Sequence, residues 1–183
     1  YGPKGVGVLY VKKGVAIEPV VNGGEQENGL RSGTENLLGI TGFGKTVESI
    51  STFLEQMNRV RELRDMLQQG IAGIFTECRV NGAGEDRLPN TLSVTLPGFR
   101  GESIVLEMDK RGIFLSSGSA CSSGSPEPSR ALMAMGLTAA EAHSSLRFSL
   151  GVDNTREDIE YTLETLAEVV RASKNIIQFV PCR

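Results

Sequence analysis

The sequence predicts a mixed α/β fold, and three observations support that prediction. Short extended segments alternate with helical segments along the chain. In two long stretches apolar residues recur every three or four positions, which is typical of helices that bury one face. In other stretches apolar and polar residues alternate, as they do in strands with one buried face.

The amino-terminal part contains two candidate strands and a long loop. Residues 5–11, GVGVLYV, form a β-branched apolar run between glycines and lysines, which is typical of a buried strand. Residues 15–21, VAIEPVV, form a second, shorter extended candidate. Glycines and polar residues dominate from residue 22 to residue 36, so we expect a long loop there.

The longest helix is predicted over residues 48–74. Its apolar residues are spaced by three and four positions, and they are Ile50, Phe53, Leu54, Met57, Val60, Leu63, Leu67, Ile71 and Ile74. Three glycines before it, Gly39, Gly42 and Gly44, indicate a separate helical piece and a bend. We therefore divide the chain here into residues 1–50, the end of one domain, and residues 51–183, a smaller α/β domain.

Short strands and helices alternate in the carboxy-terminal part. Strands are predicted over 91–97, 113–117 and 144–150, and helices over 101–112, 128–136 and from Thr155 onwards. Thr155 and Asp158 have the spacing of a capping box at the start of the last helix. Gly112 and Gly136 would end the two shorter helices.

Composition limits the possible classes of function. A hydrophobic share of 39% and a net charge of -3 are typical of an ordinary globular protein, and no apolar stretch reaches the roughly 18–20 residues of a membrane span. A mildly acidic chain with scattered basic residues gives no electrostatic reason to expect nucleic acid. Three irregularly spaced cysteines match neither a disulfide framework nor a zinc site. We therefore predict no metal site, no membrane or nucleic-acid partner, and a reducing, cytoplasmic compartment.

Cys121 lies in the run SSGSACSSGSPEPS, where serines and glycines surround a single thiol. The thiolate form of cysteine is a strong nucleophile. Its small neighbours give the backbone freedom, so the thiol could move between two positions, or it could be incidental in a solvated linker. A predicted strand before the run and a predicted helix after it tether both ends, which favours a function.

Two further segments could bind anions. In SLRFSLG, Arg147 shares a strand face with two serines, where it can grip a carboxylate in a bidentate fork or simply face solvent. The loop NGGEQENGLRSGTEN brings glycines beside Ser32 and Thr34, whose donors suit an anion such as phosphate. His143 is the single histidine, and we expect it at a helix end in a capping or core role.

Taken together, these motifs resemble the cysteine desulfurases of the NifS and IscS type, which are pyridoxal-phosphate (PLP) enzymes of the aminotransferase-like fold. The matching segments follow in family order: YGPKGVGVLYV, GLRSGTEN, LPNTLSV, SSGSACSSGSPEPSRALMAMGL and AHSSLRFSLG. The resemblance implies the carboxy-terminal part of a type I PLP fold. Residues 1–50 would end the large PLP-binding domain, and residues 51–183 would form the small domain with the cysteine loop.

The resemblance also implies a reaction and the residues that perform it. L-cysteine would react at PLP, Cys121 would take its sulfur as a persulfide, and L-alanine would leave. The sulfur would pass to an iron–sulfur scaffold or another sulfur-acceptor protein. Arg147 would hold the substrate carboxylate. Thr34 would reach across a homodimer to the phosphate of the neighbouring subunit's PLP, and Arg31 is a weaker candidate in the same loop.

The sequence departs from the family pattern in two ways. The lysine that binds PLP in the family would lie just before Tyr1, and Lys4 is not its counterpart, so we expect this chain alone to be inactive. Glu25 and Asn28 stand where the family usually has glycine and arginine. Two alternatives remain open: a selenocysteine lyase or another class V PLP enzyme, and a non-catalytic module that docks sulfur-transfer or scaffold proteins.

Overall fold

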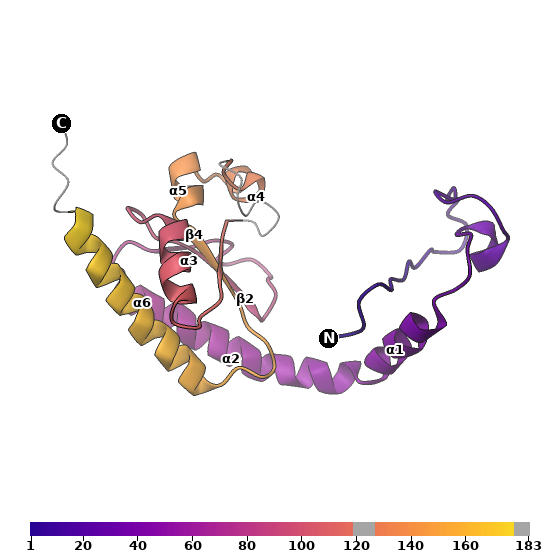
Figure 1. The fold of residues 1–183 in the computed structure, drawn as a ribbon, viewed down its shortest axis with the longest axis horizontal. Helices are drawn as coiled ribbons and strands as arrows, with labels where there is room; N and C mark the ends of the chain where they lie inside the picture. Colours follow the sequence, from indigo (N-terminus) through magenta and orange to yellow (C-terminus); the bar gives the residue numbers. More distant parts are fainter. Residues whose placement is uncertain (119–126, 178–183) are drawn as a thin grey trace. The chain divides into compact units, whose positions relative to one another are not determined.

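The computed structural model describes residues 1–118 and 127–177, with side chains as far as residue 172. Its contacts divide the chain into two units, Tyr1–Leu54 and Glu55–Arg183. Figure 1 labels the α-helices and two of the strands. The boundary predicted after residue 50 lies near this division, and the assignment of the units to a large and a small domain stays a prediction.

The first unit consists of helices and loops. A 3-10 turn, η1 (Gln26–Gly29), lies within the predicted loop, and helix α1 (Leu37–Glu48) follows it. The side chain of Asn36 caps α1 by accepting a hydrogen bond from Gly39 N at 3.1 Å. The chain leaves α1 at Ser49 and enters α2 (Ile50–Ile74), so the predicted separate helical piece and the long helix are confirmed.

The two strands predicted over residues 5–11 and 15–21 are wrong. Both segments run as loops, and their apolar side chains are largely exposed, with Val8 at 75% and Tyr10 at 86%. A strand needs a hydrogen-bonded neighbour, and a buried strand also needs apolar cover on both faces. In the described part of this unit, no other extended segment provides either.

The second unit is built on a four-stranded antiparallel sheet with the order β1-β2-β4-β3. Its strands are β1 (Arg79–Val80), β2 (Thr91–Thr95), β3 (Ser116–Ser117) and β4 (Ser145–Ser149). The strands predicted over 91–97 and 144–150 are confirmed. The strand predicted over 113–117 shortens to two residues, and β1 is too short to produce an alternating pattern.

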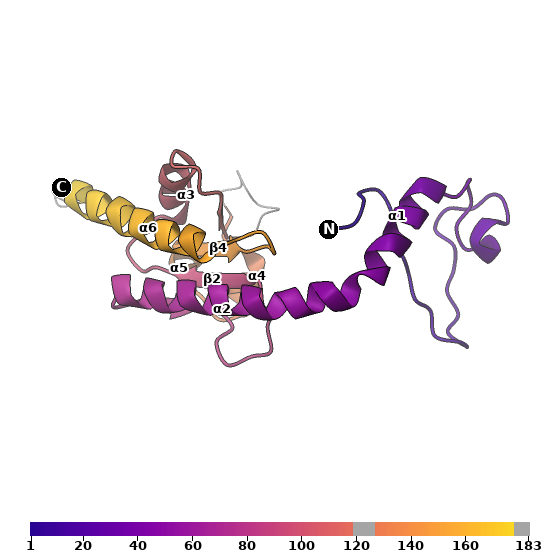
Figure 2. The same ribbon diagram turned by 90° about the horizontal axis from the view of Figure 1, so that it is seen from below.

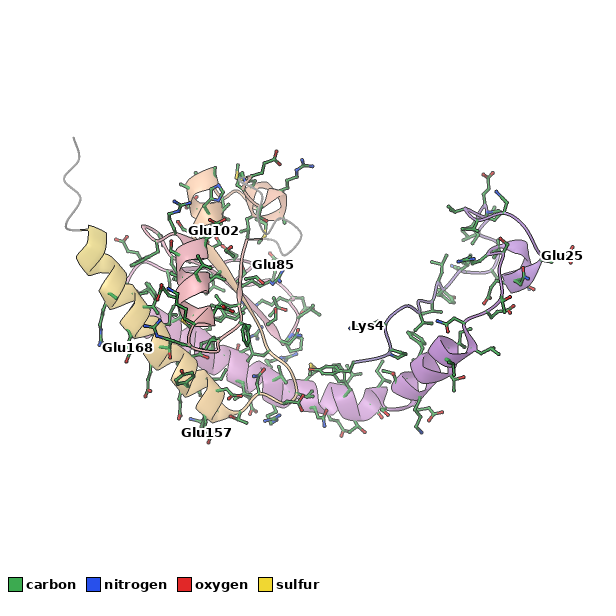
Figure 3. The ribbon with its side chains drawn as sticks, viewed as in Figure 1. Lys4, Glu25, Glu85, Glu102, Glu157 and Glu168 are labelled. Atoms are coloured by element: carbon green, nitrogen blue, oxygen red, sulfur yellow. The ribbon has the colours of Figure 1, made fainter. Side chains whose placement is uncertain are left out.

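Helices pack on this sheet and complete the mixed helix-and-sheet fold. They are α3 (Gly101–Asp109), α4 (Arg130–Ala134), α5 (Ala139–His143) and α6 (Arg156–Ile177), together with most of α2. Helix α3 contacts α6, as Figures 1 and 2 show. The exposed side chains of Glu157 and Glu168 point away from the packed face of α6 (Figure 3).

The apolar core lies between one face of the sheet and the helices. Alternation along β2 and β4 directs Leu92, Val94, Leu146 and Phe148 to one face, where each is at most 5% exposed. The helices add the buried stripes predicted from their periodicity. The core side chains of α2, α3 and α6 include Val60, Leu67, Ile71, Ile104, Met108, Ile159, Leu166, Val169 and Val170.

The opposite face of the sheet is polar and is held together by side-chain hydrogen bonds. Asn81, just after β1, donates from Nδ2 to Ser93 Oγ at 3.0 Å and to Thr95 Oγ1 at 3.1 Å. Thr95 Oγ1 lies 2.8 Å from Ser145 Oγ, which donates to the carbonyl oxygen of Glu141 at 2.8 Å. Because these partners satisfy its hydroxyl, Thr95 is buried although alternation predicted a half-buried strand.

Gly101 begins α3 where the helix meets the backbone of β4. A Cβ at this position would lie 2.9 Å from the carbonyl oxygens of His143 and Ser145 and 3.3 Å from Ser117 Cβ. We expect Gly101→Ala to lower the free energy of unfolding by about 1–3 kcal/mol, because paired backbone cannot easily move aside. Urea denaturation measures this. Gly73→Ala in α2 is the control, because its Cβ would meet nothing within 4 Å, and equal losses in both variants would contradict the account.

Two carboxylates close capping boxes at the starts of α5 and α6. Thr155 N donates to Asp158 Oδ2 at 2.9 Å, and Asp158 N donates to Thr155 Oγ1 at 3.2 Å, which confirms the predicted box. The bond from the Thr155 backbone lowers the pKa of Asp158 below its ordinary 3.8. A bond from the Thr138 backbone likewise lowers the pKa of Glu141 below 4.5.

Because the folded-state pKa of Asp158 is lowered, its stabilising effect is complete above the ordinary value and is lost as the pH falls through the lowered value. We expect Asp158→Asn to lower the free energy of unfolding at neutral pH. The difference in this free energy between the variant and wild type should shrink below about pH 4. Urea denaturation at a series of pH values tests this. Asp153→Asn, at an exposed position before the box, is the control. A difference for Asp158→Asn that stays constant with pH would contradict the prediction.

Candidate active site

Arg147 lies at the centre of the polar face of the sheet. Strand register places it opposite Ser93 of β2 on one side and Ser116 of β3 on the other. The side chain is half-buried, and its Nη2 donates to Ser116 Oγ at 3.3 Å. Its Nε is buried and has no hydrogen-bond partner among the described residues. A buried donor without an acceptor costs about 1–3 kcal/mol, so this N–H requires a physical explanation.

The charge of Arg147 is also uncompensated. Within the part of the chain that the structure describes, no carboxylate lies within ion-pair distance of its guanidinium. A half-buried guanidinium flanked by serines can take a carboxylate through charge-assisted hydrogen bonds. This arrangement fits the predicted role of Arg147 in holding a carboxylate, which stays a prediction.

Cys121 lies outside the described residues, but both flanks of its segment, residues 119–126, are described. Gly118 N donates to the carbonyl oxygen of Ser145 at 3.3 Å. Ser129 is buried and caps α4 by accepting from Leu132 N. A Cβ built on Gly118 would lie 3.8 Å from Ser129 Cβ, so the two flanks meet. Gly118 is therefore joined to β4, the strand of Arg147, and Ser129 lies beside Gly118.

Thr34 lies in the first unit, on a loop that is stabilised by hydrogen bonds of neighbouring residues. Ser32 Oγ donates to the carbonyl oxygen of Val21 at 3.1 Å, and Gln26 Oε1 accepts from Gly33 N at 3.1 Å. Thr34 is exposed, and among the described residues its hydroxyl makes no hydrogen bond. Of the two hydroxyls predicted to donate to an anion, that of Ser32 is already engaged and only that of Thr34 is free.

Other residues of this loop have contacts and backbone conformations that the sequence did not predict. Arg31 Nη1 donates to the carbonyl oxygen of Ser32, so its guanidinium is already partly used. Glu27 and Asn28 have φ values of 51° and 57°, a left-handed conformation that is uncommon for residues other than glycine. Glu25, labelled in Figure 3, is exposed at the start of η1.

The described residues fit part of a PLP site. Thr34 can give one hydrogen bond to a phosphate oxygen, and Arg147 can hold the carboxylate of an amino-acid substrate. Lys4 lies in an exposed turn (Figure 3). His143 ends α5 as predicted, but it is exposed rather than part of the core. Thr34 belongs to the first unit and Arg147 to the second.

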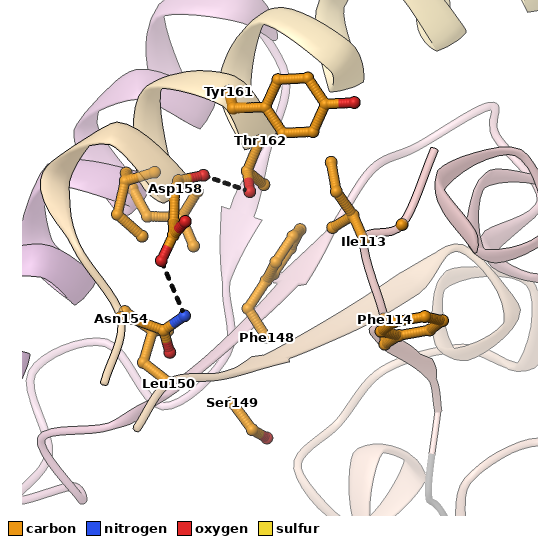
Figure 4. Close-up of a pocket in the computed structure, with 12 residues that line it drawn as sticks. Ile113, Phe114, Phe148, Ser149, Leu150, Asn154, Asp158, Tyr161 and Thr162 are labelled. Atoms are coloured by element: carbon orange, nitrogen blue, oxygen red, sulfur yellow. Dashed lines mark hydrogen bonds between the residues drawn. The ribbon is translucent and has the colours of Figure 1, made fainter. Parts of the chain in front are cut away.

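A pocket of about 430 Å³ lies beside the carboxy-terminal end of β4 (Figure 4). Its lining combines apolar and polar side chains. The apolar ones include Ile113, Phe114, Phe148, Leu150 and Ile159, and the polar ones include Ser149, Asn154, Asp158 and Thr162. The carboxylate of Asp158 is held by its capping box and by Asn154 Nδ2 at 3.3 Å. Neither Thr34 nor Arg147 lines this pocket.

The described residues offer neither a cluster of metal ligands nor a membrane-spanning helix. No three or more histidine, cysteine, aspartate or glutamate side chains gather there as they would around a metal ion. No helix in the same residues combines the length and the apolar character that crossing a bilayer requires.

Known proteins are similar to this chain in sequence and in fold. The chain matches the aminotransferase class-V family over residues 1–162, and it therefore belongs to that family. It is 43% identical over 177 residues to a protein named cysteine desulfurase IscS from Dictyoglomus turgidum, a match that covers 96% of this chain and 45% of the relative. It is 46% identical over 177 residues to cysteine desulfurase IscS 1 from Archaeoglobus fulgidus, covering 96% and 46%.

A solved structure described as a NifS-like protein has the same fold. It superposes with a TM-score of 0.77 at 36% sequence identity, over 93% of this chain and 43% of that one. The predicted resemblance to NifS and IscS proteins and the predicted fold class are thereby confirmed. The chain spans less than half the length of the relatives it matches.

Proposed function

We propose that this chain is the carboxy-terminal part of a PLP-dependent cysteine desulfurase, which converts L-cysteine to L-alanine and takes the sulfur as a persulfide on Cys121. One observation supports this most directly. A half-buried arginine whose buried Nε has no partner among the described residues lies on β4, and Gly118, just before the Cys121 segment, is hydrogen-bonded to the same strand. The relatives named cysteine desulfurases support the choice of substrate.

Arg147 would bind the substrate and orient it. Its guanidinium would hold the carboxylate of L-cysteine through charge-assisted hydrogen bonds, which fix the direction of the substrate side chain as well as its position. A buried N–H that lacks an acceptor in the described residues would then gain one. The serines on either side of Arg147 carry no charge, so they would not compete with the carboxylate.

Cys121 would accept the sulfur. Its thiolate would attack the substrate sulfur, so that a sulfur–sulfur bond forms while the carbon–sulfur bond of L-cysteine breaks. Overall, one sulfur atom moves from substrate to enzyme, and the protons of the two thiols are shared between the persulfide and L-alanine. When bound, PLP supplies the electron sink that stabilises charge on the substrate carbon.

Thr34 would contribute to cofactor binding from a second subunit. In a homodimer its free hydroxyl would donate to the phosphate of the PLP held by the neighbouring subunit. The persulfide would then pass its sulfur to an iron–sulfur scaffold or another acceptor protein. A reducing compartment such as the cytoplasm would keep Cys121 available as a thiol between turnovers.

The test is an assay of the full natural polypeptide loaded with PLP. We expect L-alanine from L-cysteine in multiple turnovers when a thiol acceptor is present. A selenocysteine lyase would form L-alanine from L-selenocysteine and not from L-cysteine. A non-catalytic docking module would form it from neither. Either of the last two results would replace the proposed function with that alternative.

A further inference from the structure

We infer that Ser116 is a positioning residue for Arg147, and that it sets the direction in which the guanidinium presents its donors to a substrate carboxylate. This inference rests on the proposed function and adds a residue to it. It starts from the unequal use of the two serines beside Arg147.

Register places both serines directly opposite Arg147. In the β3–β4 pair Ser116 lies across from Arg147, and in the β2–β4 pair Ser93 does. Residues opposite one another in an antiparallel pair share a face, with Cβ atoms about 4.5–5.5 Å apart. Either hydroxyl is therefore close enough to the stem of Arg147 to influence its side chain.

Only one of the two serines contacts the guanidinium. Ser93 Oγ accepts from Asn81 Nδ2 at 3.0 Å, which joins it to the buried network of Thr95 and Ser145. Ser116 Oγ accepts from Arg147 Nη2 at 3.3 Å. Among the described residues the guanidinium of Arg147 makes this hydrogen bond through Nη2, and its buried Nε has no partner. The orientation of the guanidinium thus depends on Ser116.

That dependence affects binding because arginine has a long, flexible side chain. Ordering it costs rotamer entropy, and a hydrogen bond present before the substrate arrives meets part of that cost in advance. The same bond uses Nη2 and leaves Nε–H without an acceptor among the described residues. Without the hydroxyl, the guanidinium would keep its charge and lose its fixed direction.

Ser116 also connects Arg147 to the segment that contains Cys121. It begins β3, which ends at Ser117, and Gly118 then bonds through its backbone to Ser145 of β4. The residue that directs the proposed carboxylate anchor therefore belongs to the same short strand that leads into residues 119–126. Strand β3 would therefore both position the substrate through Ser116 and lead into the Cys121 segment.

The experiment compares Ser116→Ala, Ser116→Thr and Ser117→Ala in the full natural polypeptide loaded with PLP. We expect Ser116→Ala to raise KM for L-cysteine roughly 3- to 10-fold with kcat within about twofold, as for the loss of one hydrogen bond of about 0.5–1.5 kcal/mol. Ser116→Thr keeps the hydroxyl and should restore KM. Ser117→Ala is the matched control, since its side chain lies on the other face, and its KM should equal that of wild type.

Binding of L-alanine and of L-alaninamide separates positioning from a general structural effect. Ser116→Ala should raise the Kd of L-alanine by the same factor as KM, and should leave the Kd of the amide, which has no carboxylate, unchanged. An unchanged KM, or equal weakening of both ligands, would overturn the inference. If wild type forms L-alanine from L-cysteine and one of these two results is found, only the proposed role of Ser116 is wrong. If wild type forms none, the proposed function itself fails.

Discussion

Replacing Cys121 with serine is expected to lower the rate of L-alanine formation from L-cysteine by about 100-fold or more in the full natural polypeptide. A thiolate forms readily near neutral pH, whereas a serine hydroxyl stays protonated and cannot form a persulfide. The variant should still bind L-cysteine, because Arg147 is unchanged. Alanine release under multiple turnovers, with PLP and an added thiol acceptor, measures the effect.

Cys78→Ser is the matched control for this prediction. Cys78 is a half-buried free thiol just before β1, so its replacement tests the general consequence of losing a cysteine from the second unit. Its rate should stay within about twofold of wild type, as for most substitutions away from a reacting group. A Cys121→Ser variant as fast as the Cys78→Ser control would show that sulfur does not travel through Cys121.

Replacing Arg147 with alanine is expected to raise KM for L-cysteine by about 100-fold or more. Each hydrogen bond to a charged group contributes about 1.5–3 kcal/mol, and a bidentate carboxylate contact contains two of them. Arg147→Lys should fall between alanine and wild type, because an ammonium keeps the charge and loses the planar fork. Initial rates over a range of L-cysteine concentrations give KM, and circular dichroism confirms that each variant is folded.

An arginine on the surface of the same unit is the control for Arg147. Arg156 at the start of α6 has a side chain that is 69% exposed, and its Nη1 lies 3.7 Å from Glu160 Oε1. Arg156→Ala removes the same charge from the protein, and KM should not change, since exposed ion pairs contribute little. A folded Arg147→Ala variant with the KM of wild type would remove the carboxylate-binding role from the proposed function.

The elements that the sequence predicted well are those whose signal is local. Helix α2 and helix α6 follow from apolar spacing alone, and the capping box of Thr155 and Asp158 marks where α6 begins. Strands β2 and β4 follow from alternation. Residues 5–11 have the same composition as a buried strand and are not one, because β-propensity describes how side chains pack against neighbours.

The candidate site was only partly predictable, because it depends on which strands become neighbours. The sequence indicated that Arg147 lies on a polar strand face. Its contact with Ser116 depends on the register of β3 and β4, two segments some thirty positions apart in the chain. The engagement of Ser32 with Val21 is likewise a contact that the pattern of loop residues did not reveal. The assignment of Cys121 still rests on its motif and on the resemblance.

Mass spectrometry of the full natural polypeptide, loaded with PLP, after one equivalent of L-cysteine and without reductant, tests the central claim most directly. The account predicts that the peptide containing Cys121 gains the mass of one sulfur atom while an equal amount of L-alanine is released. Alanine release with that peptide unchanged, or with the sulfur on Cys78 or Cys182, would contradict it.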